Sequence, residues 1–385
     1  MTVAADALCH WLELDGGALR SNLGAFRATI ARSTALMAVV KANAYGHGLE
    51  QIAPLAEPLV DWFGVHAAGE ARELRRLGIR RPVLIMGFVP PADFDALEVD
   101  DHLVISTLEE IDFALDYRKR TGVALPLHLK VDTGTNRQGF ELDELAGACR
   151  RVARAGLDIV GLMTHFANIE DTLEHDFAQH QLEIFDRARE LVRREIGGDP
   201  PIVHAACSAA ALLFRQADFS MVRVGISMYG HWPSRETHLS WILARGRDQV
   251  QLRPVLSWKA LVGQIQRVAC GETVGYGRTW CALRPTRLAV LPVGYADGYP
   301  RGLGNGARVV ACGRLLPVVG RVCMNIVLVD ATDAPEVAVG EEVLLIGRQG
   351  EVAVTVEELA SLAGTINYEL LARLSPATPR RVVGL

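Results

Sequence analysis

The sequence lacks the features that would place a protein in a membrane or on nucleic acid. Nowhere do about 18 uncharged apolar residues occur together, as a membrane-spanning helix requires, and the first residues do not combine a basic segment with a following apolar run. The 40 basic residues do not exceed the 45 acidic ones, so the chain has no excess of positive charge to attract nucleic acid or anionic lipid. We therefore expect a soluble cytoplasmic protein that binds neither partner.

Cysteines are few and scattered. There are seven, an odd number, and no two form a CxxC pair; they stand at positions 9, 149, 207, 270, 281, 312 and 323. This spacing argues against a disulfide framework and against a zinc site, so no metal is expected.

The first half of the chain alternates short apolar runs with amphipathic segments. The predicted strands cover residues 35–42, 62–66, 82–86, 102–106, 125–132, 159–165, 202–207 and 221–224. The predicted helices between them cover residues 70–77, 108–120, 141–155, 172–195 and 208–216. Eight such units favour a TIM (β/α)8 barrel, and a doubly wound parallel sheet is the alternative.

The second half has a different texture. From about residue 249, β-branched and apolar runs are separated by glycine-rich turns, and the predicted strands cover residues 261–267, 286–293, 308–311, 315–319, 323–329 and 343–346, with one helix at 356–362. At 385 residues the chain is long enough for two domains. We expect a barrel over residues 10–240 and a β-rich domain over 241–385, with residues 1–9 forming a tail or a strand on the second domain.

Lys41 is the most informative single residue. It ends an apolar run, where a buried ammonium is costly and the pKa of the amine falls, and a neutral amine can form a Schiff base with a carbonyl compound. A lysine that extends from a strand end into water is the simpler interpretation. The polar and glycine residues that follow, in residues 39–48 (VVKANAYGHG), favour a small anionic ligand instead.

Other polar residues also follow predicted strands, where barrel proteins carry their function. Lys130 and Asp132 end the fifth strand, His165 ends the sixth, Ser208 follows the seventh and Arg223 lies in the eighth. Ser208 is either part of an anion site or an ordinary N-cap, and both roles are compatible.

Residues 39–48 resemble the cofactor-lysine segment of the alanine racemases, enzymes that use pyridoxal 5'-phosphate (PLP). The resemblance extends over nearly the whole chain, through residues 127–139 (LHLKVDTGTNRQG), 161–166 (GLMTHF), 204–210 (HAACSAA), 221–230 (MVRVGISMYG), 273–280 (TVGYGRTW), 294–299 (GYADGY), 320–324 (GRVCM) and 366–369 (INYE).

The resemblance implies a role for each matching residue. Lys41 would carry PLP and serve as one catalytic base, and Tyr276 would be the second, contributed across a homodimer interface. The implied cofactor contacts are Tyr45, Ser208, Gly225, Ile226 and Tyr368 at the phosphate, Arg223 at the ring nitrogen and His165 beside the ring. The implied substrate contacts are Arg137, Tyr295 and Met324, and Lys130 corresponds to a lysine that is often carbamylated in the family.

Two positions depart from the usual pattern. Cys207 stands where asparagine is usual before the phosphate serine, and Asn325 stands where aspartate is common. Neither departure removes a catalytic group.

The expected function is alanine racemase, an isomerase that supplies D-alanine for peptidoglycan by two-base proton transfer on the PLP-bound amino acid. A racemase with a broader preference that includes serine is one alternative, because apolar pockets reject an added hydroxyl weakly. A decarboxylase of similar architecture usually has an acidic partner at the ring nitrogen, where this chain has Arg223. The alternative of another class is a non-catalytic PLP carrier, which would lack the β-rich domain.

Overall fold

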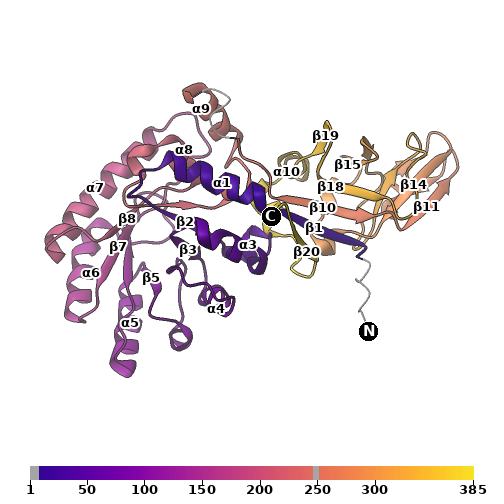
Figure 1. Cartoon of the computed structure of the whole chain (residues 1–385). Helices are drawn as coiled ribbons and strands as arrows, with labels where there is room; N and C mark the ends of the chain where they lie inside the picture. Colours follow the sequence, from indigo (N-terminus) through magenta and orange to yellow (C-terminus); the bar gives the residue numbers. More distant parts are fainter. Residues whose placement is uncertain (1–7, 246–250) are drawn as a thin grey trace. The chain divides into compact units, whose positions relative to one another are not determined.

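The computed structural model describes residues 8–245 and 251–385, and the chain divides into two compact units. The barrel unit comprises Ala18–Ala44 and the described residues of Ile52–Arg253. The β unit comprises the described residues up to Gly17, the short segment Tyr45–Gln51, and Pro254–Leu385. Both units are shown in Figure 1.

The barrel unit is built on eight parallel strands in the order β8-β7-β6-β5-β4-β3-β2-β9. They are β2 (Ala35–Val39), β3 (Trp62–Val65), β4 (Val83–Ile85), β5 (Asp101–Ile105), β6 (Leu127–Lys130), β7 (Ile159–Met163), β8 (Ile202–His204) and β9 (Met221–Val224). The two ends of this sheet meet, because Ser220 N–H donates to Val203 O (3.1 Å) and Arg223 N–H donates to Ala206 O (3.0 Å). The predicted (β/α)8 barrel is confirmed, and the doubly wound sheet is wrong.

Helices lie outside these strands, as Figure 1 shows for α5, α6 and α7. The α-helices of the first half are α1 (Gly16–Thr29), α3 (Leu49–Ala56), α4 (Ala68–Arg76), α5 (Leu108–Thr121), α6 (Leu142–Arg154), α7 (Asp176–Ile196), α8 (Ser208–Leu213) and α9 (Arg235–Arg245). The predicted helix at 172 begins only at Asp176, because the Thr172 hydroxyl accepts from Glu174 N–H (3.0 Å) in a local turn. Helix α8 stops at Leu213, since Phe214 leaves helical geometry (φ −128°, ψ 63°).

The β unit contains a seven-stranded sheet in the order β16-β15-β18-β10-β1-β20, with β19 paired to β18. These strands are β1 (His10–Asp15), β10 (Leu256–Leu261), β15 (Arg308–Ala311), β16 (Arg314–Pro317), β18 (Glu342–Gln349), β19 (Val352–Val354) and β20 (Arg380–Val383). A second sheet has the order β11-β14-β17, formed by β11 (Gln264–Val268), β14 (Thr286–Leu291) and β17 (Val327–Asp330). The predicted β-rich second half is confirmed.

Two helices accompany these sheets, α10 (Val356–Ala363) and α11 (Asn367–Ala372), of which only α10 is predicted from the sequence. Strand β1 pairs with β10 and β20, so it belongs to the β unit although the predicted barrel domain begins at residue 10. The predicted limits 10–240 and 241–385 stay a prediction. Most of the predicted tail at 1–9, namely residues 1–7, lies outside the described residues.

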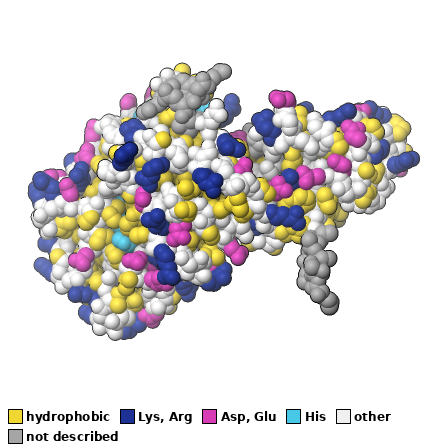
Figure 2. All heavy atoms as spheres, viewed as in Figure 1, with side chains coloured by type: hydrophobic (Ala, Val, Ile, Leu, Met, Phe, Trp, Pro, Cys, Tyr) yellow, Lys and Arg dark blue, Asp and Glu magenta, His cyan; other side chains and the backbone are white. Residues whose placement is uncertain are grey.

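Among the described residues no helix combines the length and apolar character needed to cross a bilayer. On the face displayed in Figure 2, basic and acidic side chains are interspersed, in keeping with the nearly balanced charge of the sequence.

Candidate active site

The predicted site residues of the barrel unit gather at the carboxyl ends of its strands. Lys41 follows β2, Lys130 ends β6, His165 follows β7, Ser208 begins the helix after β8, and Arg223 lies in β9. Because the strands are parallel, these positions share one end of the barrel. The structure therefore brings together residues that the sequence separates by up to 182 positions (223 − 41).

The chain leaves β2 through an unusual left-handed turn, α2 (Lys41–Tyr45). Ala42, Asn43 and Ala44 all have φ of 54°, a conformation that costs about 1–2 kcal/mol per non-glycine residue. Glu70 braces the turn, since its Oε1 accepts from Ala42 N–H (2.6 Å) while its Oε2 accepts from His66 N–H (2.8 Å). Strain of this kind, held by surrounding hydrogen bonds, is typical of functional sites.

The electrostatics of Lys41 favour a reactive amine. Burial is the largest cause that lowers its pKa, and the positive charges of Arg137 and Arg223 lower it further, against the opposing effect of Glu70. The pKa of His165 is lowered well below its ordinary value, first by burial and then by Arg223, Arg137 and both lysines. These mutual effects identify four basic side chains around a neutral His165, which we call the cationic cluster: Lys41, Lys130, Arg137 and Arg223.

Lys130 is almost fully buried in this cluster. Burial, followed by Arg137 and Arg223, lowers its pKa to about 8. The carboxylate of Asp132, two residues on, accepts from the backbone N–H groups of Gly134, Thr135, Asn136 and Arg137 (2.8–3.1 Å). Lys130 Nζ instead donates to Gln138 Oε1 over 3.4 Å.

Ser208 and Gly225, which are 17 positions apart, are in direct contact. The Ser208 hydroxyl accepts from Gly225 N–H (3.0 Å), and Ile226 begins the buried 3-10 turn η4 (Ile226–Tyr229). Ser208 is the first residue of α8 rather than its N-cap, a position that Cys207 occupies without a side-chain capping bond. The structure thus places all three predicted phosphate contacts of the barrel unit side by side.

Arg223 is held by several acceptors at once. Its Nη2 donates to Thr164 O (2.9 Å) and Ala205 O (2.8 Å), and the same nitrogen lies 3.3 Å from His165 Nδ1. Its Nη1 donates to His204 Nδ1 at 2.7 Å. Burial lowers the pKa of Arg223 to about 10, so the guanidinium remains a cation at neutral pH.

The β unit carries the remaining predicted cofactor contacts, Tyr45 and Tyr368. Their ring centroids lie 6.1 Å apart, so the structure brings these two tyrosines together although 323 positions (368 − 45) separate them. Gly46, next to Tyr45, packs directly on α11, where a Cβ at Gly46 would lie 1.9 Å from Leu371 O. Only glycine permits this approach of the Tyr45 segment to the helix that contains Tyr368.

Tyr276 projects from a turn in the β unit. It begins η5 (Tyr276–Arg278), between β12 (Thr273–Val274) and β13 (Trp280–Cys281), and is flanked by Gly275 (φ 72°) and Gly277 (φ 74°). Its side chain is 72% exposed. Within one chain, Tyr276 is therefore an exposed aromatic residue in a glycine-flanked turn.

Tyr295 and Met324 lie on adjacent backbone segments of the same unit. Tyr295 N–H donates to Cys323 O (3.0 Å), and Ala296 N–H donates to Met324 O (2.9 Å). A Cβ at Gly294 would lie 2.2 Å from Met324 O, so glycine is needed for this contact. Both side chains are exposed, Tyr295 by 43% and Met324 by 56%.

The sequence reasoning assigned no role to three histidines that the structure connects to Arg223. His204 contacts Arg223 directly, His128 contacts His204, and His102 contacts His128. The available signal was weak: each histidine is directly followed by an apolar residue in a predicted strand, with nothing in the local pattern to link the three.

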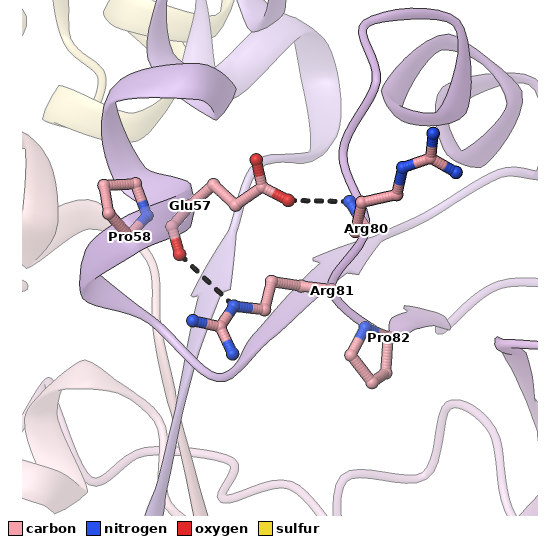
Figure 3. Close-up of a pocket in the computed structure, with 5 residues that line it drawn as sticks. All are labelled: Glu57, Pro58, Arg80, Arg81 and Pro82. Atoms are coloured by element: carbon pink, nitrogen blue, oxygen red, sulfur yellow. Dashed lines mark hydrogen bonds between the residues drawn. The ribbon is translucent and has the colours of Figure 1, made fainter.

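A surface pocket of the barrel unit lies at the other ends of the strands. It is lined by Glu57, Pro58, Arg80, Arg81 and Pro82, the last of which immediately precedes β4 (Figure 3). Glu57 Oε1 accepts from Arg80 N–H (2.6 Å), and Glu57 O accepts from Arg81 Nε–H (3.4 Å). In barrels this end serves stability rather than catalysis, so we assign the pocket a structural role.

Comparison with known proteins agrees with this geometry. The model for the alanine racemase N-terminal domain matches residues 14–233, and that for the C-terminal domain matches residues 255–382. The alanine racemase of Leptospira interrogans is 37% identical over 98% of this chain and 97% of its own, and that of Symbiobacterium thermophilum is 40% identical over 96% of each. The crystal structure of Bacillus anthracis alanine racemase with bound L-Ala-P has a TM-score of 0.91 and 34% identity, covering 99% of this chain and 97% of that one. These full-length matches favour neither the broader serine racemase nor the non-catalytic carrier.

Proposed function

This chain belongs to the alanine racemase family, and we propose that it interconverts L-alanine and D-alanine by two-base proton transfer, with PLP carried on Lys41 and Tyr276 as the second base. The observation that carries the proposal is the partly buried Lys41 amine, whose pKa is lowered at the end of β2 within the cationic cluster. The product would enter cell-wall precursors, and a cytoplasmic location is part of the proposal.

The residues present fit PLP. Its phosphate is an anion and suits the cationic cluster, and the Ser208 hydroxyl, Gly225 and Ile226 offer a buried polar patch for it at the same barrel end. In the β unit the paired Tyr45 and Tyr368 would add phosphate contacts. When bound, PLP supplies an electron-withdrawing ring that stabilises the negative charge left at the α-carbon.

Arg223 would face the ring nitrogen. With a pKa of about 10, its guanidinium keeps its protons at neutral pH and does not act as an acid. The ring nitrogen therefore stays largely unprotonated, which limits the electron-withdrawing power of the ring and favours simple proton exchange over side reactions.

Racemisation requires one base on each face of the α-carbon. Lys41 serves one face, because burial and neighbouring cations favour its neutral amine. Tyr276 serves the other, and its 72% exposure within one chain means that a further surface must desolvate it. We assign that surface to a second copy of the chain, so the active enzyme would be a homodimer with Tyr276 contributed across the interface.

Substrate binding would use Arg137, whose planar fork of donors suits a carboxylate, together with Tyr295 and Met324. Arg137 and Lys130 are neighbouring cations, a repulsive arrangement that an anion relieves. We include in the proposal that Lys130 forms a carbamate. The neutral amine adds CO2 and releases one proton, and the resulting negative charge holds Arg137 in place.

The test is incubation of the purified protein with PLP and L-alanine in heavy water. D-alanine carrying deuterium at the α-carbon is expected, because the proton that returns comes from a base that has exchanged with solvent. Deuterium without inversion would contradict the two-base scheme, and the absence of both from alanine would contradict the proposed function. L-serine in a parallel reaction measures the breadth of the substrate preference.

A further inference from the structure

Three imidazoles form a continuous hydrogen-bonded line in the barrel unit. His102 Nδ1 lies 3.0 Å from His128 Nε2, and His128 Nδ1 lies 3.0 Å from His204 Nε2. The line ends at Arg223, whose Nη1 is 2.7 Å from His204 Nδ1. It begins near the amino end of β5, where His102 is the second residue, and ends at the carboxyl end of β8, where His204 is the last.

Arg223 gives this line a direction. A guanidinium has only donors, so His204 Nδ1 must be an unprotonated acceptor. Burial holds His204 and His128 neutral, with pKa values well below the ordinary range, so each ring carries one proton. His204 therefore donates from Nε2 to His128 Nδ1, and His128 donates from Nε2 to His102 Nδ1. All three rings must be the Nε2–H tautomer.

The surrounding structure is shaped for this line. His128 and His204 have no exposed surface. Gly161 of β7 is the register partner of His128 on the adjacent strand β6. A Cβ at Gly161 would lie 2.0 Å from His128 Nδ1, so the missing side chain at 161 creates the space for the imidazole. Trp62 presents its ring edge-on to His102 and His128, at centroid distances of 4.5 and 6.1 Å.

We propose that His102 and His128 are positioning residues for Arg223: they fix His204 as the tautomer that accepts from the guanidinium. A proton added to His102 Nδ1 would turn that atom into a donor that faces the Nε2–H donor of His128. To remove this repulsion, His128 and then His204 would have to change from the Nε2–H to the Nδ1–H tautomer. The reversal would end with two donors facing each other at Arg223. The link to catalysis rests on the proposed function, in which Arg223 faces the cofactor ring, whereas the tautomers do not depend on it.

Burial keeps the outer end of the line, His102, neutral at physiological pH, and the charged groups around it act in both directions. Burial lowers the pKa of His102 to about 4, with an opposing effect of Asp100 and a further lowering by Arg75, which pairs with Asp101 at 2.7 Å. Arg223 and His102 lower the pKa of His128 beyond the effect of burial. Near pH 7 the line should therefore stay in one direction.

The first test is 15N NMR of histidine-labelled full-length protein, recorded at pH 7 with and without PLP. The signals are assigned with variants that each lack one histidine. We expect an unprotonated Nδ1 and a protonated Nε2 for His102, His128 and His204. A protonated Nδ1 on any of the three would overturn the proposal. Because this readout needs no turnover, it stands even if the protein fails to racemise alanine, so the two proposals fail separately.

The second test compares two substitutions at the outer end. His102→Leu removes the acceptor for His128, whereas His102→Asn retains an acceptor oxygen near the position of Nδ1. In His102→Leu we expect His204 to show a mixture of tautomers and kcat to fall roughly two- to tenfold, the effect of losing one hydrogen bond. His102→Asn should restore both the single tautomer of His204 and kcat.

Leu129→Val is the control for a simple packing defect, because Leu129 is the buried neighbour of His128 on β6. It should leave the protonation of the His204 nitrogens unchanged. Unchanged His204 nitrogens in His102→Leu would overturn the proposal.

Discussion

The two units present their candidate residues in opposite ways. In the barrel unit Lys130 is 6% exposed and Arg223 4%, and burial is the largest cause that lowers the pKa of each. In the β unit Tyr276 is 72% exposed and Met324 56%. The barrel unit thus desolvates and orients Lys130 and Arg223 by itself, whereas Tyr276 and Met324 of the β unit need another surface before they can act in a dry site.

This difference teaches where the chemistry is preorganised. Buried donors and acceptors with fixed partners, such as Arg223 with Thr164 O and Ala205 O, cost no rearrangement during a reaction. The exposed Tyr276 has no such environment within its own chain. Its reactivity should depend on assembly, while cofactor binding at Lys41 should depend on the barrel residues.

Substitution of Lys41 should have the largest effect. Lys41→Ala removes both the amine proposed to carry PLP and one of the two proposed bases, so kcat should fall by at least about 10³-fold. The absorbance of the lysine-bound cofactor should disappear as well, measured on the dialysed protein. Lys119→Ala, at an exposed lysine of α5, is the control and should change neither. Unchanged turnover in Lys41→Ala would contradict the assignment of Lys41 as the cofactor lysine and as one of the two bases.

Tyr276→Phe should distinguish the role of the β unit in proton transfer from the role of the barrel unit in cofactor binding. It deletes one hydroxyl from an exposed residue, so the cofactor absorbance should persist while racemisation falls about 10²- to 10⁴-fold. The loss should be most severe for proton removal from L-alanine, measured as α-deuterium exchange from each enantiomer separately. Tyr117→Phe in α5, which deletes a hydroxyl from a buried tyrosine outside the proposed site, is the control for loss of a phenol as such. Equal, normal exchange from both enantiomers would show that one base serves both faces.

Mixing these two inactive variants tests whether Tyr276 acts across an interface. If it does, a mixed dimer of Lys41→Ala and Tyr276→Phe has one intact site out of two. Random reassembly makes about half of the dimers mixed, so activity should recover to about a quarter of the unsubstituted level. Sedimentation measurements on the same samples should report a dimer. No recovery, with reassembly shown by differently tagged copies, would place Tyr276 in the site of its own chain.

The same contrast between units explains what the sequence could predict. The eight barrel strands could be identified because each is a short apolar run bounded by polar residues, and parallel strands necessarily align their carboxyl ends. Lys41, Lys130 and His165 were therefore predictable as neighbours. The left-handed turn at Ala42–Ala44 was not, because alanine has no preference for positive φ and Glu70, which braces it, is 28 positions away from Ala42.

The histidine line was equally hidden from sequence reasoning. His102, His128 and His204 lie on three different strands, and their contacts depend on the register of the barrel and on the space left by Gly161. The N-cap of α8 is Cys207, one position before the serine that the sequence pattern favours. Serine is a preferred N-cap, but the Ser208 hydroxyl accepts from Gly225 N–H instead. Such details follow from tertiary contacts rather than from local pattern.

The carbamate proposed on Lys130 gives a pH-dependent test of the cationic cluster. With its pKa lowered to about 8, roughly a tenth of the amine is neutral at pH 7 and about half at pH 8. The neutral amine is the form that reacts with CO2, and the reaction releases a proton. At fixed dissolved CO2 the ratio of carbamate to unmodified amine should therefore rise about fiftyfold across this interval, about fivefold from the neutral amine and tenfold from the lower proton concentration. The measurement is 13C NMR with labelled bicarbonate, with Lys130→Arg to identify the signal. A signal that persists in Lys130→Arg, or that does not grow with pH, would contradict the modification.

The smallest effect is expected at Cys207, the N-cap of α8. Its backbone is extended (φ −92°, ψ −174°), as an N-cap requires, but its side chain makes no capping bond. In Cys207→Asn the amide oxygen can accept from the backbone N–H of Ala209 or Ala210, which now face the Cys207 sulfur, and such a cap is worth about 0.5–2 kcal/mol. Because Ser208 and the contact to Gly225 follow directly, a firmer first turn should slow PLP loss during dialysis by about two- to fivefold. Cys207→Ser should act in the same direction and Cys207→Ala should not, since alanine has no side-chain acceptor. Equal retention in all three variants would mean that this helix end is already held by its tertiary contacts, and that the departure from asparagine is neutral for cofactor affinity.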